Sequence, residues 1–154
     1  MDTTTLESSY RRLLDVARGG PTRPPADTGD WPGEAVLAHV AANDRLLAAV
    51  TAQLLDGGSP SYDNGAAGGR PYLDVLAQAA GEWDSLVATV RQCGLELVLL
   101  ARRLDDRQAA TAVPTRITDG GAVRVQGPVP WAGVLNTHAE VHLPAHTRQL
   151  AALR

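Results

Sequence analysis

The sequence predicts an all-α protein, a four-helix bundle formed by a single domain over residues 1–154. Apolar residues recur at helical spacing in four separate segments, and the connections between these segments are rich in proline, glycine and polar residues. Strands do not alternate with helices along the chain, which argues against a parallel α/β sheet. A small hairpin before the last helix is the only β-structure that the pattern indicates.

The first two helices are expected on either side of a proline-rich loop. An amphipathic stripe at i, i+4, i+7, i+8 and i+11 predicts a helix that ends before Gly19-Gly20. The following segment, PTRPPADTGD, cannot sustain helical hydrogen bonding. Asp30 is expected to cap the second helix, which opens at Trp31-Pro32 and runs to Gly57-Gly58. The stripe of the first helix consists of Leu6, Tyr10, Leu13, Leu14 and Ala17.

Residues 57–71 form a turn-rich connection. Within it, Asp63 and Asn64 either make an Asx turn, which is the favoured expectation, or close over the site. From Tyr72 to Leu104 the pattern predicts one long helix or two stacked pieces, because glycine costs about 1 kcal/mol relative to alanine inside a helix. The segment TRITDGGAVRV alternates at period two around an Asp-Gly-Gly turn and predicts the hairpin. The last helix opens at Pro130 or Trp131 and runs to the C-terminus.

Composition excludes several classes of partner. The formal net charge is −3 and all 14 basic residues are arginine, so the chain lacks the basic surface that nucleic acids and anionic membranes select. The most apolar run is much shorter than the ~20 residues needed to cross a bilayer. One cysteine forms no internal disulfide, and the N-terminus has no apolar signal-peptide core. A cytoplasmic protein that binds a small molecule is therefore expected, with a homodimer possible at this size.

Three of the four histidines lie in the last helix, one helical turn apart. Histidines four residues apart share a helix face and can bind one metal ion. His138 and His146 lie about 12 Å apart along the axis, too far to share an ion. The ligand pair is therefore 138/142 or 142/146. Pro144 is expected to bend the helix and aim the rings of the second pair, unless it simply ends the helix and leaves His146 on the surface.

The third ligand of a bundle-core metal site should come from a facing helix. His39, in the second helix, is the only remaining histidine. A single histidine on an apolar helix is more often a hydrogen-bonded core residue, but the cluster in the last helix favours ligation. Three imidazoles with open coordination positions are typical of a catalytic rather than a structural zinc site.

Two motifs resemble those of the DinB-like superfamily, which includes the mycothiol-dependent maleylpyruvate isomerase N-terminal type and the bacillithiol S-transferases. WPGEAVLAHVAAND places Trp31 eight residues before His39, and HLPAHTRQL resembles the H-x-x-x-H-x-x-Q of the family, with Gln149 at its glutamine. The resemblance covers nearly the whole chain. It implies a bundle with up-down-down-up topology and a divalent metal held by His39, His142 and His146. Zinc is the first choice, with nickel, iron or manganese as alternatives.

Several other residues are candidates for the site. Asn43 shares the face of His39 and is a candidate for orienting a ligand or cosubstrate. Arg70 is a candidate anchor for an anionic substrate, as are Arg116 and Arg124, because guanidinium suits carboxylates. Cys93 is expected to be a buried thiol rather than a nucleophile. The three tryptophans are expected to supply core and loop-anchoring area, and no catalytic residue is singled out.

The sequence thus predicts a metal-dependent enzyme. The resemblance implies a thiol-dependent S-transferase or isomerase, with a low-molecular-weight thiol as cosubstrate and a small electrophilic substrate. Two alternatives stay open at this point. One is a non-catalytic bundle that binds a metal or a small molecule, and the other is a hydrolase or lyase that uses metal-bound hydroxide.

Overall fold

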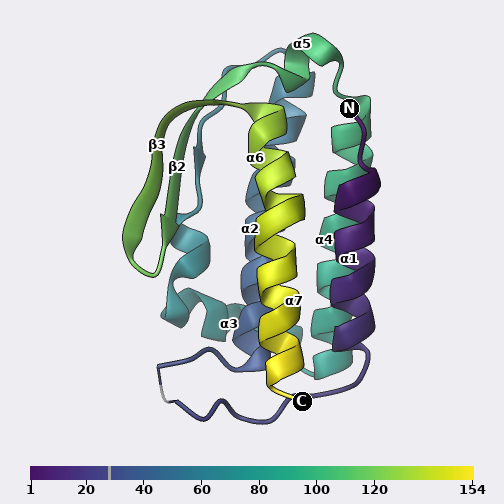
Figure 1. Ribbon diagram of the computed structural model, residues 1–154, viewed down its shortest axis with the longest axis vertical. Coiled ribbons are helices and arrows are strands. Elements are labelled where there is room, and N and C mark those ends of the chain that lie inside the picture. The colour runs from purple at the N-terminus through teal and green to yellow at the C-terminus, as the bar shows by residue number, and fades with distance from the viewer. Residues whose placement is uncertain (28) are drawn as a thin grey trace.

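The all-α prediction is wrong, because a three-stranded sheet packs beside the helices. The computed structural model describes residues 1–27 and 29–154; it is 65% helical, and its sheet has the order β1-β2-β3 (Figure 1). The fold is therefore a mixture of helices and sheet. The long elements are α1 (Thr4–Ala17), α2 (Gly33–Leu55), α4 (Trp83–Arg103) and a C-terminal column of α6 (Trp131–Thr137), η2 (His138–His142) and α7 (Leu143–Ala152).

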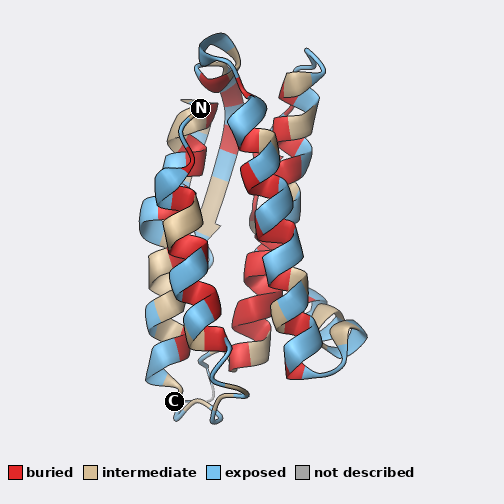
Figure 2. Cartoon of the chain, turned by 90° about the vertical axis from the view of Figure 1, so that its right-hand side faces the viewer, coloured by how far each residue is buried: buried red, intermediate tan, exposed pale blue. Residues whose placement is uncertain are grey.

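The first two helices form as their apolar patterns predict. α1 buries the whole predicted stripe, and α2 is buried over most of its length because it lies between the other long helices and the sheet (Figure 2). The predicted Asp30 cap is wrong. Pro32 is the residue before α2, and no side chain caps its first turn. Asp30 lies two residues before the cap position, so it is too early in the chain to cap the helix.

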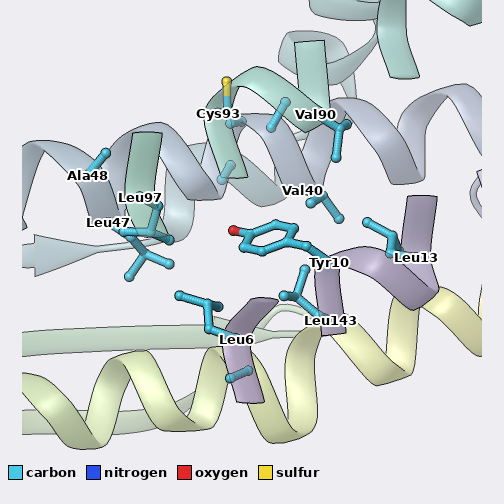
Figure 3. Close-up of a cluster of buried hydrophobic side chains, with 14 of the residues drawn as sticks. Leu6, Tyr10, Leu13, Val40, Leu47, Ala48, Val90, Cys93, Leu97 and Leu143 are labelled. Carbon is cyan, nitrogen blue, oxygen red and sulfur yellow. The ribbon is translucent and has the colours of Figure 1, made fainter. Parts of the chain in front are cut away.

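The segment 70–104 forms two helices rather than one. α3 (Arg70–Ala80) ends at Gly81, whose φ of +81° only glycine adopts readily, and α4 begins two residues later. Gly94 does not break α4. It lies against the ring of Tyr10, which enters the core between α1, α2, α4 and the C-terminal column (Figure 3).

Replacing Gly94 by alanine is expected to destabilise the fold by about 1–3 kcal/mol. A β-carbon there would lie 2.7 Å from Cε1 of Tyr10, so the ring must shift, although alanine regains about 1 kcal/mol of helix propensity. Urea unfolding measures the change. Gly133→Ala in α6 is the matched control, because its nearest contact would be an ordinary 3.7 Å. Equal stability of the two variants would contradict the close packing of Tyr10 on Gly94.

The hairpin is longer than the segment that the alternating pattern predicts. β2 (Ala112–Asp119) and β3 (Ala122–Pro130) pair antiparallel around Gly120-Gly121, both with positive φ, so the predicted Asp-Gly-Gly turn is confirmed. β1 (Tyr62–Asp63) joins β2 in parallel and is followed by the short helix η1 (Gly65–Gly68). A two-residue strand is too short for a periodic pattern, so β1 could not be predicted from the sequence. The connection from α4 to the hairpin contains α5 (Asp106–Ala109).

The C-terminal column has a widened turn where the sequence predicts a bend. η2 is π-helical, with the Leu143 amide bonded to the His138 carbonyl five residues back. Pro144 lies in the first turn of α7, where its missing amide costs least, and the column continues without breaking. The expectation of a proline bend is therefore corrected to a π turn just before the proline. Within the described part of the chain, no helix combines the length and apolar character that a membrane crossing requires.

Candidate metal centre

Three histidines from two packed helical columns meet at one point. His39 comes from α2, His142 from the end of η2 and His146 from α7, and one nitrogen of each lies within 4.8 Å of the others. The Nε2 atom of His142 lies 2.8 Å from that of His39 and 3.2 Å from that of His146. The structure therefore brings together all three predicted ligands, and it favours the pair 142/146 over 138/142.

Hydrogen bonds on the far nitrogens orient two of these rings. His39 Nδ1 lies 2.6 Å from the carbonyl of Ala67 in η1, and His146 Nδ1 lies 3.0 Å from Oε1 of Gln149. Both partners are oxygens that accept, so each Nδ1 carries the proton and each Nε2 keeps a lone pair directed at the cluster. Such outer partners are usual for metal-binding histidines.

The donor set fits a divalent transition metal. Lone pairs of His39 and His146 point at His142 Nε2, an arrangement that a shared proton or a cation must compensate. His142 Nδ1 is buried without a hydrogen-bond partner among the described residues. Zinc with bonds of about 2.0–2.1 Å to three imidazoles needs ligand nitrogens roughly 3.4 Å apart. The Nε2 atoms of His39 and His146 lie 2.8 Å and 3.2 Å from that of His142, so the rings need to move only slightly apart to hold the ion.

Burial keeps these imidazoles neutral. It is the largest cause of the lowered pKa of His39, of His142 and of His146, whose pKa falls to about 4. The other imidazoles of the site lower these pKa values further, because each would repel a second positive charge. Neutral imidazole is the form that binds metals, so the cluster is ready to bind an ion at neutral pH.

Trp31 covers the outer side of the cluster. Its ring is edge-on to His39, with centroids 5.0 Å apart, and parallel to His146 at 6.4 Å. The sequence predicted only a packing role for this tryptophan. In the structure it also screens two of the three imidazoles from solvent, which lowers the local dielectric around them.

The cluster opens into a cavity of about 960 Å³ between α2, the C-terminal column and the hairpin. This volume lies at the upper end of the range for small-molecule sites. The helical walls are mostly apolar, and the opposite rim is rich in glycine. Residues that line the cavity include Leu47, Tyr62, Val134 and Val141 on one side, and Gly65, Gly69, Ile117, Gly120 and Val125 on the other.

The two predicted cofactor-binding residues lie in different places relative to the cavity. Asn43 lies in the cavity wall, where its Oδ1 accepts a 2.6 Å hydrogen bond from the Tyr62 hydroxyl. Arg70 lies outside the cavity at the start of α3, paired with Asp74 at 2.7 Å on the surface. The interpretation of Arg70 as a ligand anchor is therefore not supported by its position, because its guanidinium is directed along its own helix.

The other candidate side chains are mostly structural. Arg116 pairs with Asp63 on the surface, and Arg124, which does line the cavity, pairs with Asp119 at 3.6 Å. The predicted Asx turn is present, since Asp63 Oδ1 accepts from the Gly65 amide. Cys93 is buried, as predicted, and burial raises the pKa of its thiol.

One residue near the site escaped the sequence analysis as a functional candidate. Asp44 is fully buried beside His138, with its Oδ1 3.0 Å from His138 Nε2. Asn64 accepts from the Thr118 amide at 2.7 Å and donates to its carbonyl at 3.0 Å, which ties η1 to the hairpin at a register shift. Asp44 could have been noticed in the sequence, because it is a carboxylate in a helix that is apolar on nearly every face. Asn64 was considered as a residue that closes over the site, but its partner Thr118, 54 residues away, could not be predicted from the sequence.

Comparisons with known proteins add nothing to this geometry. No family model, curated protein or solved structure matches the chain. The likeness to the DinB-like superfamily therefore rests on the two sequence motifs alone.

Proposed function

We propose that this protein is a divalent-metal-dependent enzyme that joins a small thiol to an electrophilic substrate. His39, His142 and His146 would hold the metal, with zinc the ion that best suits three neutral imidazoles. The observation that carries the proposal is the convergence of three Nε2 atoms on the wall of a large cavity. A bound ion would supply a Lewis acid that lowers the pKa of a thiol or of water.

The protein residues would position the reactants and exclude water. Ala67 and Gln149 hold the rings of His39 and His146 in one tautomer, so their nitrogens need no reorganisation when the ion binds. Trp31 shields the ligands from solvent. The mostly apolar wall suits a neutral electrophile, and the volume is sufficient for a thiol and its substrate side by side.

In the transfer reaction, the thiol loses its proton to solvent and its sulfur forms a bond to the electrophilic carbon. The leaving group departs with the electron pair of the bond that breaks. For an isomerase the sulfur adds and is later eliminated, so the thiol is regenerated. The resemblance to the DinB-like superfamily supports thiol chemistry, and we place it in the cytoplasm, where low-molecular-weight thiols are reduced.

Conjugate formation tests this function. Zinc-loaded protein is mixed with 1-chloro-2,4-dinitrobenzene and one thiol at a time, namely mycothiol, bacillithiol, glutathione or cysteine. We expect one thiol to give a rate at least tenfold above the uncatalysed reaction, and the rate to disappear in His142→Ala. Cys93→Ser is the control and should keep full activity, because this thiol is buried away from the cavity.

The remaining outcomes separate the alternatives. Stoichiometric zinc without thiol-dependent turnover would leave a non-catalytic metal-binding protein. Hydrolysis of ester substrates without any thiol would indicate a metal-dependent hydrolase instead. A protein that binds no divalent metal would refute all the metal-dependent functions together.

A further inference from the structure

A second polar cluster lies behind the three metal-binding histidines. His138 is nearly fully buried and lies outside the ligand set. Its Nε2 is 3.0 Å from Asp44 Oδ1 and 3.1 Å from the Tyr10 hydroxyl, and its Nδ1 is 3.3 Å from Asn43 Nδ2. Asn43 in turn accepts from the Tyr62 hydroxyl. The contacts thus form one chain from a buried carboxylate to the cavity wall, which His138, Asn43 and Tyr62 all line.

The π turn explains why His138 belongs to this second cluster. An α-helix would place His138 and His142 on one face, as the sequence spacing suggests. The widened turn over His138–His142 changes the angle between these two residues. The two rings stay close, with centroids 4.9 Å apart, but Nε2 of His142 contacts His39, whereas Nε2 of His138 contacts Asp44.

The carboxylate decides which nitrogen of His138 carries the proton. Asp44 has no aligned hydrogen-bond donor among the described residues, so it acts on His138 mainly through its charge. A carboxylate oxygen 3.0 Å away attracts an N–H and repels a nitrogen lone pair. Nε2 therefore carries the proton, which the Tyr10 oxygen can accept, and Nδ1 is an acceptor.

This tautomer fixes each later member of the chain. Because His138 Nδ1 accepts, Asn43 must direct its NH₂ group toward this ring. The 3.3 Å contact between Asn43 Nδ2 and His138 Nδ1 agrees with this orientation. The amide oxygen of Asn43 is then directed at Tyr62, whose only hydroxyl proton is used in the 2.6 Å hydrogen bond. The Tyr62 oxygen is left with lone pairs and no proton to offer a ligand.

We propose that Asp44 sets the hydrogen-bond polarity of the deep cavity wall through His138 and Asn43, so that Tyr62 selects ligands that donate a hydrogen bond. Asp44, His138 and Asn43 are positioning residues, and Tyr62 is the residue that meets the ligand. The ligand is thus a molecule with an O–H or N–H group directed at Tyr62. The ligand binds in the cavity of the proposed function. Only its reaction there, and not its hydrogen bond to Tyr62, rests on that function.

The tautomer of His138 is the first test, and it needs no metal. Nitrogen-15 NMR of chelator-treated protein, assigned by comparison with His138→Gln, distinguishes Nε2–H from Nδ1–H. We expect Nε2 to carry the proton and Nδ1 to keep a lone pair. A proton on Nδ1 would overturn the proposal, because Asn43 could not then direct its NH₂ group at this ring. Absence of metal binding would refute the proposed function and leave this result unchanged.

Ligand discrimination is the second test. Phenol and its methyl ether anisole have similar shapes, but only phenol donates a hydrogen bond. Titrations followed through the His138 and Tyr62 ring signals of chelator-treated protein are expected to give about fivefold tighter binding of phenol, the value of one net hydrogen bond. Equal binding of the two probes would overturn the proposal.

Asp44→Asn should remove this preference. The new amide can donate to His138 Nε2, which moves the ring proton to Nδ1, reverses Asn43 and frees the Tyr62 proton. We expect the phenol preference to fall to twofold or less and the tautomer signal to change. Asp74→Asn, a surface carboxylate of α3, is the matched control and should keep the fivefold ratio. An unchanged binding ratio in a folded Asp44→Asn protein would overturn the proposal. If this variant does not fold, the tautomer of His138 and the phenol-to-anisole ratio of the wild-type protein still test the proposal.

Discussion

His142→Ala is expected to abolish stoichiometric zinc binding, with an affinity loss of at least about 100-fold. His142 Nε2 lies close to both other ligand nitrogens, 2.8 Å from that of His39 and 3.2 Å from that of His146, and its removal leaves only two ligands. Mass spectrometry of the native protein and competition with a chromophoric chelator measure stoichiometry and affinity. Circular dichroism confirms that the variant is folded.

His138→Gln provides the comparison for this experiment. Its ring lies outside the ligand set, so we expect the variant to keep one zinc ion per chain. His146→Ala should resemble His142→Ala. If His138→Gln lost the metal and His146→Ala kept it, the ligand pair would be 138/142, and the arrangement of the C-terminal column would need revision.

The metal-free protein is expected to lose stability steeply between pH 7 and pH 4. The pKa of His146 falls from 6.5 to about 4 on folding, chiefly because of burial, and the pKa values of His39 and His142 are lowered for the same reason. Below pH 6.5 the unfolded chain therefore binds more protons than the folded one. The stabilising contribution is complete above pH 6.5 and is lost as the pH falls toward 4. For His146 alone it is roughly 3 kcal/mol.

Urea unfolding at pH 7, 6, 5 and 4 with a chelator measures this loss. His146→Gln carries no titratable ring and should show a shallower pH dependence over the same range. Stability that stayed constant or rose as the pH fell from 7 to 5 would contradict the burial of neutral imidazoles at this site.

The helices and the ligand histidines could be predicted because their signals are local. The stripe of α1 repeats within 14 residues, and the i, i+4 spacing of His142 and His146 is a property of one helix. The hairpin turn was equally visible, since glycine at both central positions favours positive φ. The size of the sheet was not visible, because β2 gains its second partner, β1, from about 50 residues earlier in the chain.

The all-α class was wrong for the same reason. β1 has two residues and no pattern of its own, and it exists only because β2 offers an open edge. The contacts of Arg70 and of His138 could likewise not be predicted from the sequence. Arg70 had the right chemistry for an anchor, but the start of α3 directs it to Asp74.

By itself, the sequence determined the positions of the long helices, the hairpin turn and the i, i+4 spacing of the histidines in the last helix. Each of these depends on propensity and spacing within one segment. Only the tertiary structure decided that a sheet forms one wall of the cavity, that His138 contacts Asp44 while its neighbour His142 contacts His39, and that Asp44 lies buried. These features depend on contacts between residues far apart in the chain, whose free energies no local pattern records.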